Sequence, residues 1–188
     1  MSDQPKKPWQ TLNSSVKYDN PWIKVVEDQV INPSGGRGIY GKVHYKKIAI
    51  GIIPIDEAGN TWLVGQHRYP LDVYSWEIPE GGCPEGEDKL RAAKRELKEE
   101  TGLSAKFWKQ IQHMHLSNSV SDESSYVYIA TDLTEGSTDF EDTEDLQVKK
   151  LPISEAVQMA MNGQITDAIS VAALLKLDKM MQDGTLEF

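Results

Sequence analysis

The chain has 188 residues, of which 39% are hydrophobic and 26% charged, and its net charge at pH 7 is -9. This length can bury the core of one domain, and the composition is ordinary for a soluble globular protein. The acidic balance argues against general binding to nucleic acid or to anionic membranes, since both need a basic surface, but an anionic small substrate is still possible if a metal inverts the local charge.

The N-terminal segment is polar. Residues 1–10 hold two lysines and no apolar stretch, so we expect no signal peptide there. No apolar run approaches the length of a membrane span, so we expect no membrane partner. The one cysteine, Cys83, excludes an internal disulfide framework and fits a reducing compartment. These features predict a cytoplasmic protein.

Strands dominate the predicted first half of the chain. Residues 1 to about 16 are expected to form a loosely ordered lead-in. β-Branched residues then predict a strand over Trp22–Ile31 and one or two strands over Lys42–Ile55. The turn residues of Asp56–Asn60 predict a hairpin, whose second strand begins at Trp62–Gly65.

The second half of the chain mixes helices and strands. A helix fits Asp88–Thr101, with an apolar stripe along it and Gly102 in place for a left-handed C-terminal cap. The remaining expected elements are strands near 108–116 and 125–130, an acidic stretch over 135–145, and helices over 151–161 and from about 167. This order indicates a mixed α/β domain with helices packed on a mixed sheet.

Three carboxylates of the predicted helix, Glu96, Glu99 and Glu100, are spaced so that they share one helix face. They repel one another, and a divalent cation such as Mg²⁺ or Mn²⁺ would turn that repulsion into a binding site. Arg95 lies four residues before Glu99 and can hold that carboxylate in one rotamer. Taken alone, the spacing fits a solvated acidic face better, and Arg95 fits an ordinary surface ion pair.

The residues before the helix shift this balance toward a metal site. Gly81 and Gly82 are expected to form a loop before the helix, and they carry no side chains, so backbone groups there can approach a ligand closely. Gly81, Glu87 and the run Arg95–Leu103 match every fixed position of the Nudix hydrolase signature. The chain therefore resembles the Nudix family, which implies hydrolysis of a nucleoside diphosphate linked to another moiety, with divalent metal ions bound by the signature helix.

The resemblance also implies roles for individual residues. The metal ligands would be the side chains of Glu96, Glu99 and Glu100, with Glu96 and Glu100 as the principal ones, and the backbone carbonyl of Glu80. Arg95 and Glu87 would orient the cluster. Since a base outside the helix is often required, the acidic stretch is the best place to seek it. Glu144 is the first choice and Asp142 the second, although each also fits a merely solvated acid.

Outside the signature, the chain resembles the branch that contains ADP-ribose pyrophosphatases and related nucleoside diphosphate sugar hydrolases. The segments that carry this resemblance are Gln66–Pro70, Trp76–Gly81, Ser117–Glu123 and Gly163–Ala168. Many relatives have Ser-Pro-Gly where this chain has Ser117-Asn118-Ser119, and this departure concerns the fit of the terminal sugar.

The same resemblance predicts substrate contacts, which are Trp22, Arg68, Glu77, Ser117 and Glu123. Two interpretations are open for Arg68: a residue that binds a phosphate of the substrate, or an exposed arginine in a hairpin. Two are also open for Glu77: a residue that contacts the ligand, or the ion-pair partner of Arg68. Glu123 fits a substrate or metal contact, or a capping acid. Trp22 fits an aromatic platform for a nucleobase, or a tryptophan packed in the core or in a dimer.

The resemblance implies a Nudix-fold α/β/α sandwich with a mixed sheet. It also implies that residues 1–44 form an N-terminal β extension that pairs two subunits into a homodimer, and that 45–188 form the catalytic domain. The expected reaction splits nucleoside diphosphate sugars such as ADP-ribose into a nucleoside monophosphate and a sugar phosphate. The alternatives are another pyrophosphate substrate (a GDP-sugar or a dinucleotide) and a non-catalytic nucleotide sensor, which the intact signature carboxylates oppose.

Overall fold

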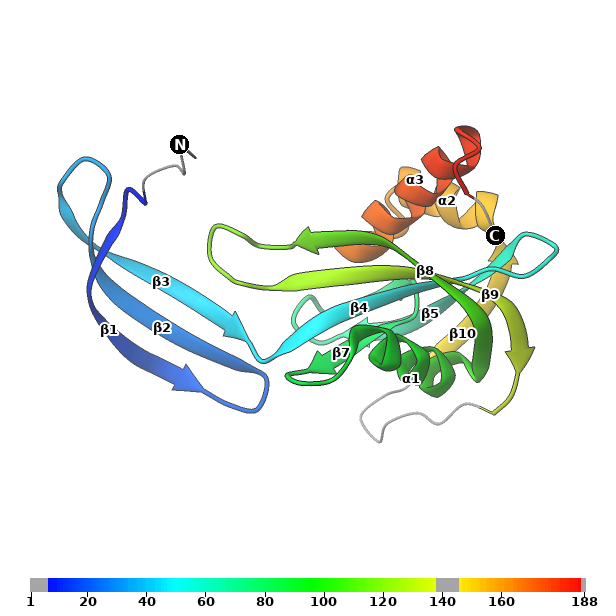
Figure 1. Ribbon diagram of the computed structural model, residues 1–188, viewed down its shortest axis with the longest axis horizontal. Coiled ribbons are helices and arrows are strands. Elements are labelled where there is room, and N and C mark those ends of the chain that lie inside the picture. Colours follow the sequence, from blue (N-terminus) through cyan, green and yellow to red (C-terminus); the bar gives the residue numbers. More distant parts are fainter. Residues whose placement is uncertain (1–6, 138–145, 187–188) are drawn as a thin grey trace, which may run out of the picture. The chain divides into compact units, whose positions relative to one another are not determined.

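The computed structural model describes residues 7–137 and 146–186, and the chain divides into two compact units (Figure 1). The first unit takes the chain up to Lys47 together with His115–Glu123. The second unit takes Ile48–Met114 and the chain from Ser124 onward. No helix among the described residues is both long enough and apolar enough to cross a membrane.

The first unit is built on an antiparallel sheet of β1 (Gln10–Asp19), β2 (Ile23–Ile31) and β3 (Arg37–Tyr45), in that order. β1 corrects the expected loose lead-in. Its backbone pairs with β2 while nearly all its side chains are exposed, so no burial pattern marked it in the sequence. β3 also begins earlier than expected.

The 115–123 segment is attached to β3. The Val43 amide donates to the Val120 carbonyl at 2.8 Å, and the Tyr40 hydroxyl donates to the Ser119 carbonyl at 2.6 Å. The Asp122 carboxylate lies 2.6 Å from His44 Nδ1. These bonds explain why a segment distant in sequence belongs to the N-terminal unit.

The second unit contains two sheets. The strands are β4 (Lys47–Pro54), β5 (Asn60–Arg68), β6 (Val73–Glu77), β7 (Glu80–Pro84), β8 (Leu103–His115), β9 (Ser124–Glu135) and β10 (Gln147–Pro152). One sheet has the order β7-β4-β9-β8 and the other β10-β5-β6. β4 and β9 are parallel, whereas β5 is antiparallel to β6 and to β10, so the architecture is mixed as predicted.

Three local expectations for this unit were wrong. The turn at Asp56–Asn60 forms, with Gly59 at φ 77°, but β4 and β5 lie in different sheets and make no hairpin. Glu80–Pro84 is a strand, although its glycines predicted a loop. Leu151 lies in strand β10 where a helix was expected to open, because 147–152 pairs with β5.

The helices are α1 (Lys89–Thr101), α2 (Ile153–Met161) and α3 (Ala168–Gln182). Asp88 caps α1 by accepting a hydrogen bond from the Arg91 amide at 2.9 Å. Gly102 ends α1 with φ 73°, which confirms the predicted left-handed cap. Asp167 caps α3 in the same way as Asp88 caps α1, through the Ser170 amide at 2.7 Å.

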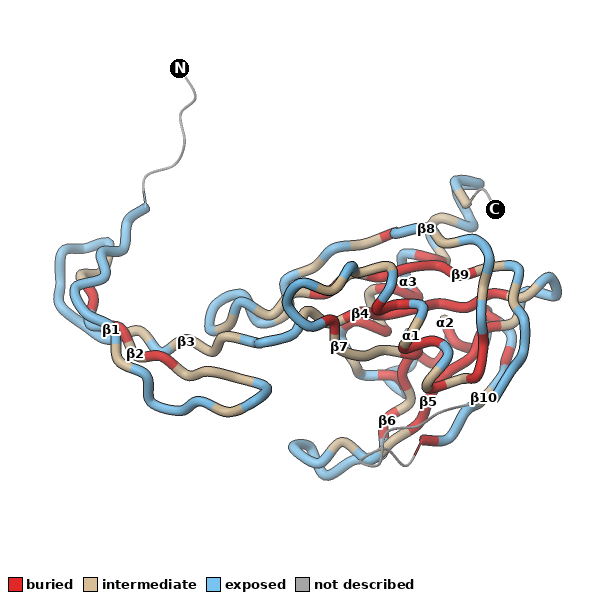
Figure 2. The backbone as a smooth tube through the Cα atoms, turned by 60° about the horizontal axis from the view of Figure 1, so that its bottom comes forward, coloured by how far each residue is buried: buried red, intermediate tan, exposed pale blue. Residues whose placement is uncertain are grey.

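β4 separates two helical layers because its side chains alternate between its two faces. Ile50 and Ile52 share a buried cluster with Leu97 of α1. Gly51 faces the other way, and a Cβ added there would lie 2.9 Å from the side chain of Ile169 in α3. The result is an α/β/α sandwich, whose buried residues concentrate in the central strands and the helix faces against them (Figure 2).

Candidate active site

Arg95 gathers the carboxylates of the signature helix. Its Nη1 donates to Glu96 Oε1 and to Glu99 Oε2, both at 2.8 Å. Its Nη2 donates to the Gly82 carbonyl at 2.9 Å and lies 3.3 Å from Glu87 Oε2. Burial opposes the charge on Arg95, but the bonds to Glu87, Glu99 and Glu96 outweigh it and raise its pKa. One guanidinium thus fixes three carboxylates and ties α1 to β7.

The approach of β7 to α1 leaves no room for a side chain at Gly81. A Cβ added there would lie 2.1 Å from the Glu96 carboxyl carbon. The next residue back along β7, Glu80, donates its amide to Glu100 Oε2 at 2.9 Å. Glu96 and Glu100 are 8% and 2% exposed, so both carboxylates are held in a buried site against the strand.

A second acidic group adjoins the first. Carboxylate oxygens of Glu77, Glu80 and Asp167 all lie within 4.8 Å of one another, which is close enough to share a cation. Arg68 binds this group: Nε donates to Glu77 Oε1 at 2.9 Å, Nη2 donates to Glu77 Oε2, and Nη2 also lies 3.3 Å from Glu80 Oε1. The predicted neighbours Arg68 and Glu77 therefore form a bidentate ion pair.

Burial and charge set the protonation of this second group. Burial raises the pKa of Glu80 well above its usual value, and the nearby charges of Asp167 and Glu77 act in the same direction. Burial also pushes the pKa of Glu77 upward, but the hydrogen bonds from Arg68 and Glu80 hold it below its usual value. The hydrogen bond with Glu77 raises the pKa of Arg68, which stays charged.

Asp167 had been assigned no site role from the sequence. In the sequence it lies within the Gly163–Ala168 segment of the family resemblance and at the predicted start of the last helix, where an acid has a structural reason. Glu77 and Glu80 are far from it along the chain, so only the packing of α3 reveals their proximity. Asp167 thus combines helix capping with a place in the acidic group.

The predicted site residues do not all lie in one unit. Trp22, Ser117 and Glu123 belong to the first unit, whereas the carboxylates, Arg68 and Glu77 belong to the second. Trp22 is 64% exposed, and the Ser117 carbonyl accepts hydrogen bonds from the amides of residues 120 and 121 at 3.0 and 2.8 Å. The proposed bases Glu144 and Asp142 lie outside the described residues.

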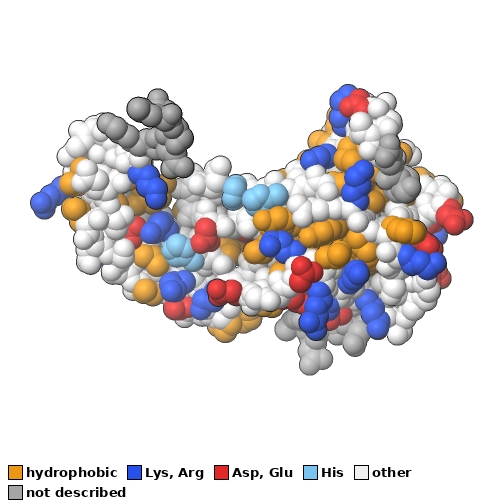
Figure 3. All heavy atoms as spheres, viewed as in Figure 1, with side chains coloured by type: hydrophobic (Ala, Val, Ile, Leu, Met, Phe, Trp, Pro, Cys, Tyr) orange, Lys and Arg blue, Asp and Glu red, His pale blue; other side chains and the backbone are white. Residues whose placement is uncertain are grey.

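The donor chemistry fits a divalent cation. Carboxylate and backbone carbonyl oxygens are the ligands that Mg²⁺ and Mn²⁺ prefer. Gly81 keeps open the space beside Glu96 that a Cβ would fill. On the face shown in Figure 3, basic and acidic side chains are interspersed, so negative charge is not a uniform property of the surface.

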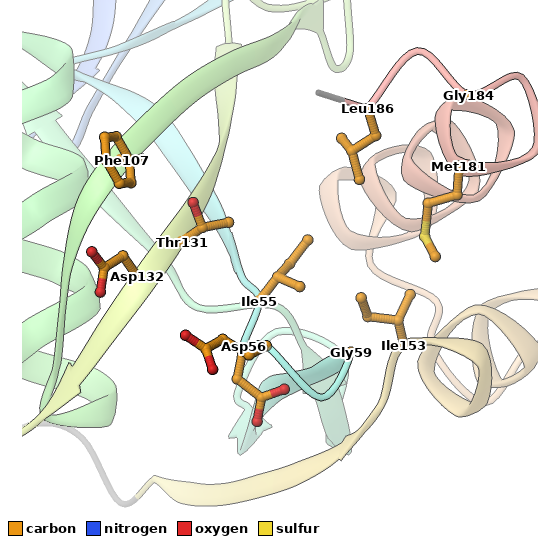
Figure 4. A pocket seen from close by; sticks show the side chains of 11 residues that line it. Ile55, Asp56, Gly59, Phe107, Thr131, Asp132, Ile153, Met181, Gly184 and Leu186 are labelled. Atoms are coloured by element: carbon orange, nitrogen blue, oxygen red, sulfur yellow. The ribbon is translucent and has the colours of Figure 1, made fainter. Parts of the chain in front are cut away.

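The second unit also contains a pocket of about 650 Å³ (Figure 4). Its lining includes Ile55, Ile153 and Met181 and none of the predicted site residues. Two of its carboxylates, Asp56 and Asp132, pair with Lys150 and Lys106, each at 2.8 Å. The residues predicted to carry the chemistry therefore do not line this pocket.

Two family models match the chain and cover most of it. The NUDIX domain matches residues 45–173, and the nucleoside diphosphate sugar hydrolase N-terminal domain matches residues 9–43.

Individual relatives agree with these matches. An ADP-ribose pyrophosphatase of Mycobacterium tuberculosis is 32% identical over 170 residues, which are 89% of this chain and 82% of the relative. An ADP-ribose pyrophosphatase of Bacillus subtilis is 29% identical over 138 residues, which are 71% and 75% of the two chains. A crystal structure of an ADP compounds hydrolase superposes with a TM-score of 0.85 at 20% identity, covering 97% of this chain and 100% of that one, and this likeness concerns the fold.

Proposed function

The chain belongs to the Nudix family, and on that premise we propose that it hydrolyses the pyrophosphate bond of nucleoside diphosphate sugars, with ADP-ribose as the leading substrate. Water would add to one phosphorus and the bridging P–O bond would break, giving a nucleoside monophosphate and a sugar phosphate. The observation that carries this proposal is the carboxylate group of Glu96, Glu99 and Glu100 on one helix, of which Glu96 and Glu100 are buried. Arg95 binds Glu96 and Glu99, and Glu96 lies against Gly81.

Glu96, Glu99, Glu100 and the Glu80 carbonyl would hold Mg²⁺, or Mn²⁺ in its place. When bound, such an ion neutralises pyrophosphate charge and lowers the pKa of an attacking water. Arg95 contributes by keeping Glu96 and Glu99 in fixed rotamers. Metal binding then costs less conformational entropy, because these side chains are already ordered.

Arg68 is proposed to bind a phosphate of the substrate. Its side chain is 37% exposed, and its bonds to Glu77 and Glu80 run through Nε and Nη2. Glu77 orients the guanidinium plane, which leaves the Nη1 edge to meet a phosphate oxygen. Glu144, with Asp142 as the alternative, remains the proposed general base on the strength of the sequence resemblance.

Trp22, Ser117 and Glu123 are proposed to contact the nucleotide sugar. The exposure of the Trp22 indole supports a stacking role, because a core tryptophan would be buried. We expect Trp22→Ala to raise KM for several nucleotide sugars together by roughly 10-fold, the loss of one base–aromatic stack, with kcat little changed. Steady-state kinetics on two nucleotide sugars measures this.

Trp9→Ala is the matched control for this variant, since Trp9 is an exposed tryptophan of the same unit that packs on Tyr40 at 5.2 Å between ring centroids. An unchanged KM for Trp22→Ala would leave Trp22 without a role in base binding. If sedimentation also showed a changed oligomeric state, Trp22 would be a dimer contact.

A homodimer is proposed, formed through the N-terminal extension of residues 1–44 beside a catalytic domain of 45–188. The sheet of the first unit supports it because Leu12, Val16, Tyr18 and Ile39 are all more than half exposed, which is unusual for large apolar side chains of one small sheet. A cytoplasmic location is proposed from the lone cysteine, Cys83, which is free and buried.

A substrate panel tests the proposed function. Purified protein with Mg²⁺ would be offered ADP-ribose, a GDP-sugar and a dinucleotide, and phosphate would be measured after phosphatase treatment, which acts on the monoester products only. We expect the highest kcat/KM with ADP-ribose. Preference for a dinucleotide would replace the proposed substrate, and release from none of them would favour a nucleotide-sensing module.

A further inference from the structure

The junction between β6 and β7, residues Ile78–Glu80, is held by three different elements. The Ile52 amide of β4 donates to the Pro79 carbonyl at 2.8 Å. The Glu80 amide donates to Glu100 of α1 at 2.9 Å. The Ile78 amide donates to the Ser170 hydroxyl of α3 at 3.0 Å. The junction ends at Glu80, and Gly81 follows it; these are the two backbone positions that the proposed metal site uses.

Of these three hydrogen bonds, only the one to Ser170 uses a neutral side chain. The other two use a backbone carbonyl and a carboxylate. Ser170 is fully buried, with an exposed fraction of 0%, and its neighbours on the inner face of α3 are the apolar residues Ile169, Ala173 and Leu174. A hydroxyl gains nothing from an apolar core unless it has a hydrogen-bond partner, and the Ile78 amide is that partner.

The first turn of α3 is itself fixed. Asp167 Oδ2 accepts a hydrogen bond from the Ser170 amide at 2.7 Å, which places the Ser170 side chain at the start of the helix. The Asp167 carboxylate also lies within 4.8 Å of those of Glu77 and Glu80. The first turn of α3 therefore contacts the junction in two ways. Ser170 binds the Ile78 amide, and Asp167 lies beside the carboxylates of Glu77 and Glu80.

We propose that Ser170 is a positioning residue for the metal site. Through the Ile78 amide it fixes the peptides that carry the Glu80 carbonyl and bring Gly81 against Glu96. There is little space between Gly81 and Glu96, because a Cβ added at Gly81 would lie 2.1 Å from the Glu96 carboxyl carbon. A small shift of the Gly81 backbone would therefore disturb Glu96. This inference rests on the proposed function, since it assigns Ser170 to the same site.

Ser170→Ala removes the acceptor of the Ile78 amide and keeps the size of the side chain nearly constant. We expect the dissociation constant of Mn²⁺, measured from the electron paramagnetic resonance signal of the free ion, to rise by roughly 10-fold, as for other residues that orient metal ligands. The Mg²⁺ concentration for half-maximal hydrolysis should rise by a similar factor, with kcat at saturating Mg²⁺ less affected. Ser170→Thr, which retains the hydroxyl, should restore Mn²⁺ binding.

Ala173→Gly is the matched control. Ala173 lies one turn further along the same buried face of α3, and glycine there weakens the helix without touching the junction. A weaker Mn²⁺ affinity in Ser170→Ala and an unchanged one in Ala173→Gly supports the inference. Equal effects in both variants, or none in Ser170→Ala, would overturn it.

Two further measurements distinguish failure of this inference from misfolding of the variant and from failure of the proposed function. If thermal unfolding shows that Ser170→Ala does not fold, Ser170→Cys replaces it, since the thiol keeps the volume but accepts hydrogen bonds weakly. The same shift in Mn²⁺ affinity is expected from that variant, and its absence counts against the inference. Failure of the proposed function would be visible in the unaltered protein, which would neither bind Mn²⁺ nor hydrolyse a nucleoside diphosphate sugar.

Discussion

Replacing Glu100 by glutamine is expected to lower kcat for ADP-ribose by at least about 100-fold while leaving the fold intact. Glu100 is 2% exposed and accepts the amide hydrogen bond of Glu80, so it faces the site from the buried side of α1. A glutamine carbonyl can still accept that bond, and the loss is therefore confined to the negative charge that a metal ligand must supply. Steady-state kinetics and Mn²⁺ titration measure the change.

Glu85→Gln is the matched control, because Glu85 is an exposed glutamate of the same motif at a variable position. We expect it to keep nearly normal activity and normal Mn²⁺ affinity. If Glu100→Gln also kept near-normal turnover with a normal thermal transition, the assignment of the metal site to the signature helix would be wrong.

Gly81→Ala is expected to reduce Mg²⁺-dependent activity by roughly 100-fold, through geometry and not through charge. The added methyl group would overlap the Glu96 carboxylate, with 2.1 Å between its carbon and the carboxyl carbon, so either Glu96 or strand β7 must move. Since Arg95 holds Glu96 and the Gly82 carbonyl together, a displacement of one disturbs the other. Activity and Mn²⁺ affinity should fall together.

Gly38→Ala controls for the loss of glycine flexibility in a strand. Gly38 also lies in a strand, and a Cβ added there meets no atom within 4 Å. This variant should behave as the unaltered protein. An active Gly81→Ala protein with undiminished Mn²⁺ affinity would show that the close approach of β7 to Glu96 is not required for metal binding.

Local signals were sufficient to predict α1 and the contacts along it. An apolar stripe and Gly102 act within a few residues of one another, and the observed helix ends at the expected cap. The bond between Arg95 and Glu99 likewise follows from a spacing of four residues on a helix. The signature could be recognised for the same reason, since its residues follow one another along β7, the turn after it, α1 and the start of β8.

Strands stabilised mainly by their partners could not be predicted in this way. β1 is almost entirely exposed, so no alternation of buried residues marks it, and its pairing with β2 supplies the order. Residues 147–152 join the sheet beside β5, and that pairing overrides the helix expected to open at Leu151. The separation of β4 and β5 into two sheets also depends on distant partners, chiefly β9.

The parts of the site that link distant segments were equally hidden. The acidic group of Glu77, Glu80 and Asp167 forms because α3 packs its first turn against the junction of β6 and β7. From the sequence, Asp167 was a residue near the start of the last helix and Ser170 one serine among several. Their position beside the proposed metal site follows from tertiary packing alone.

The most direct test of metal-dependent pyrophosphate hydrolysis is product analysis with ADP-ribose. Purified protein, ADP-ribose and Mg²⁺ would be incubated together and separated by ion-exchange chromatography, with and without a chelator. We predict that AMP and ribose 5-phosphate appear in equal amounts, and that the chelator abolishes both. Intact ADP-ribose after prolonged incubation with Mg²⁺, or cleavage that continues in the presence of the chelator, would contradict the role assigned to Glu96, Glu99 and Glu100.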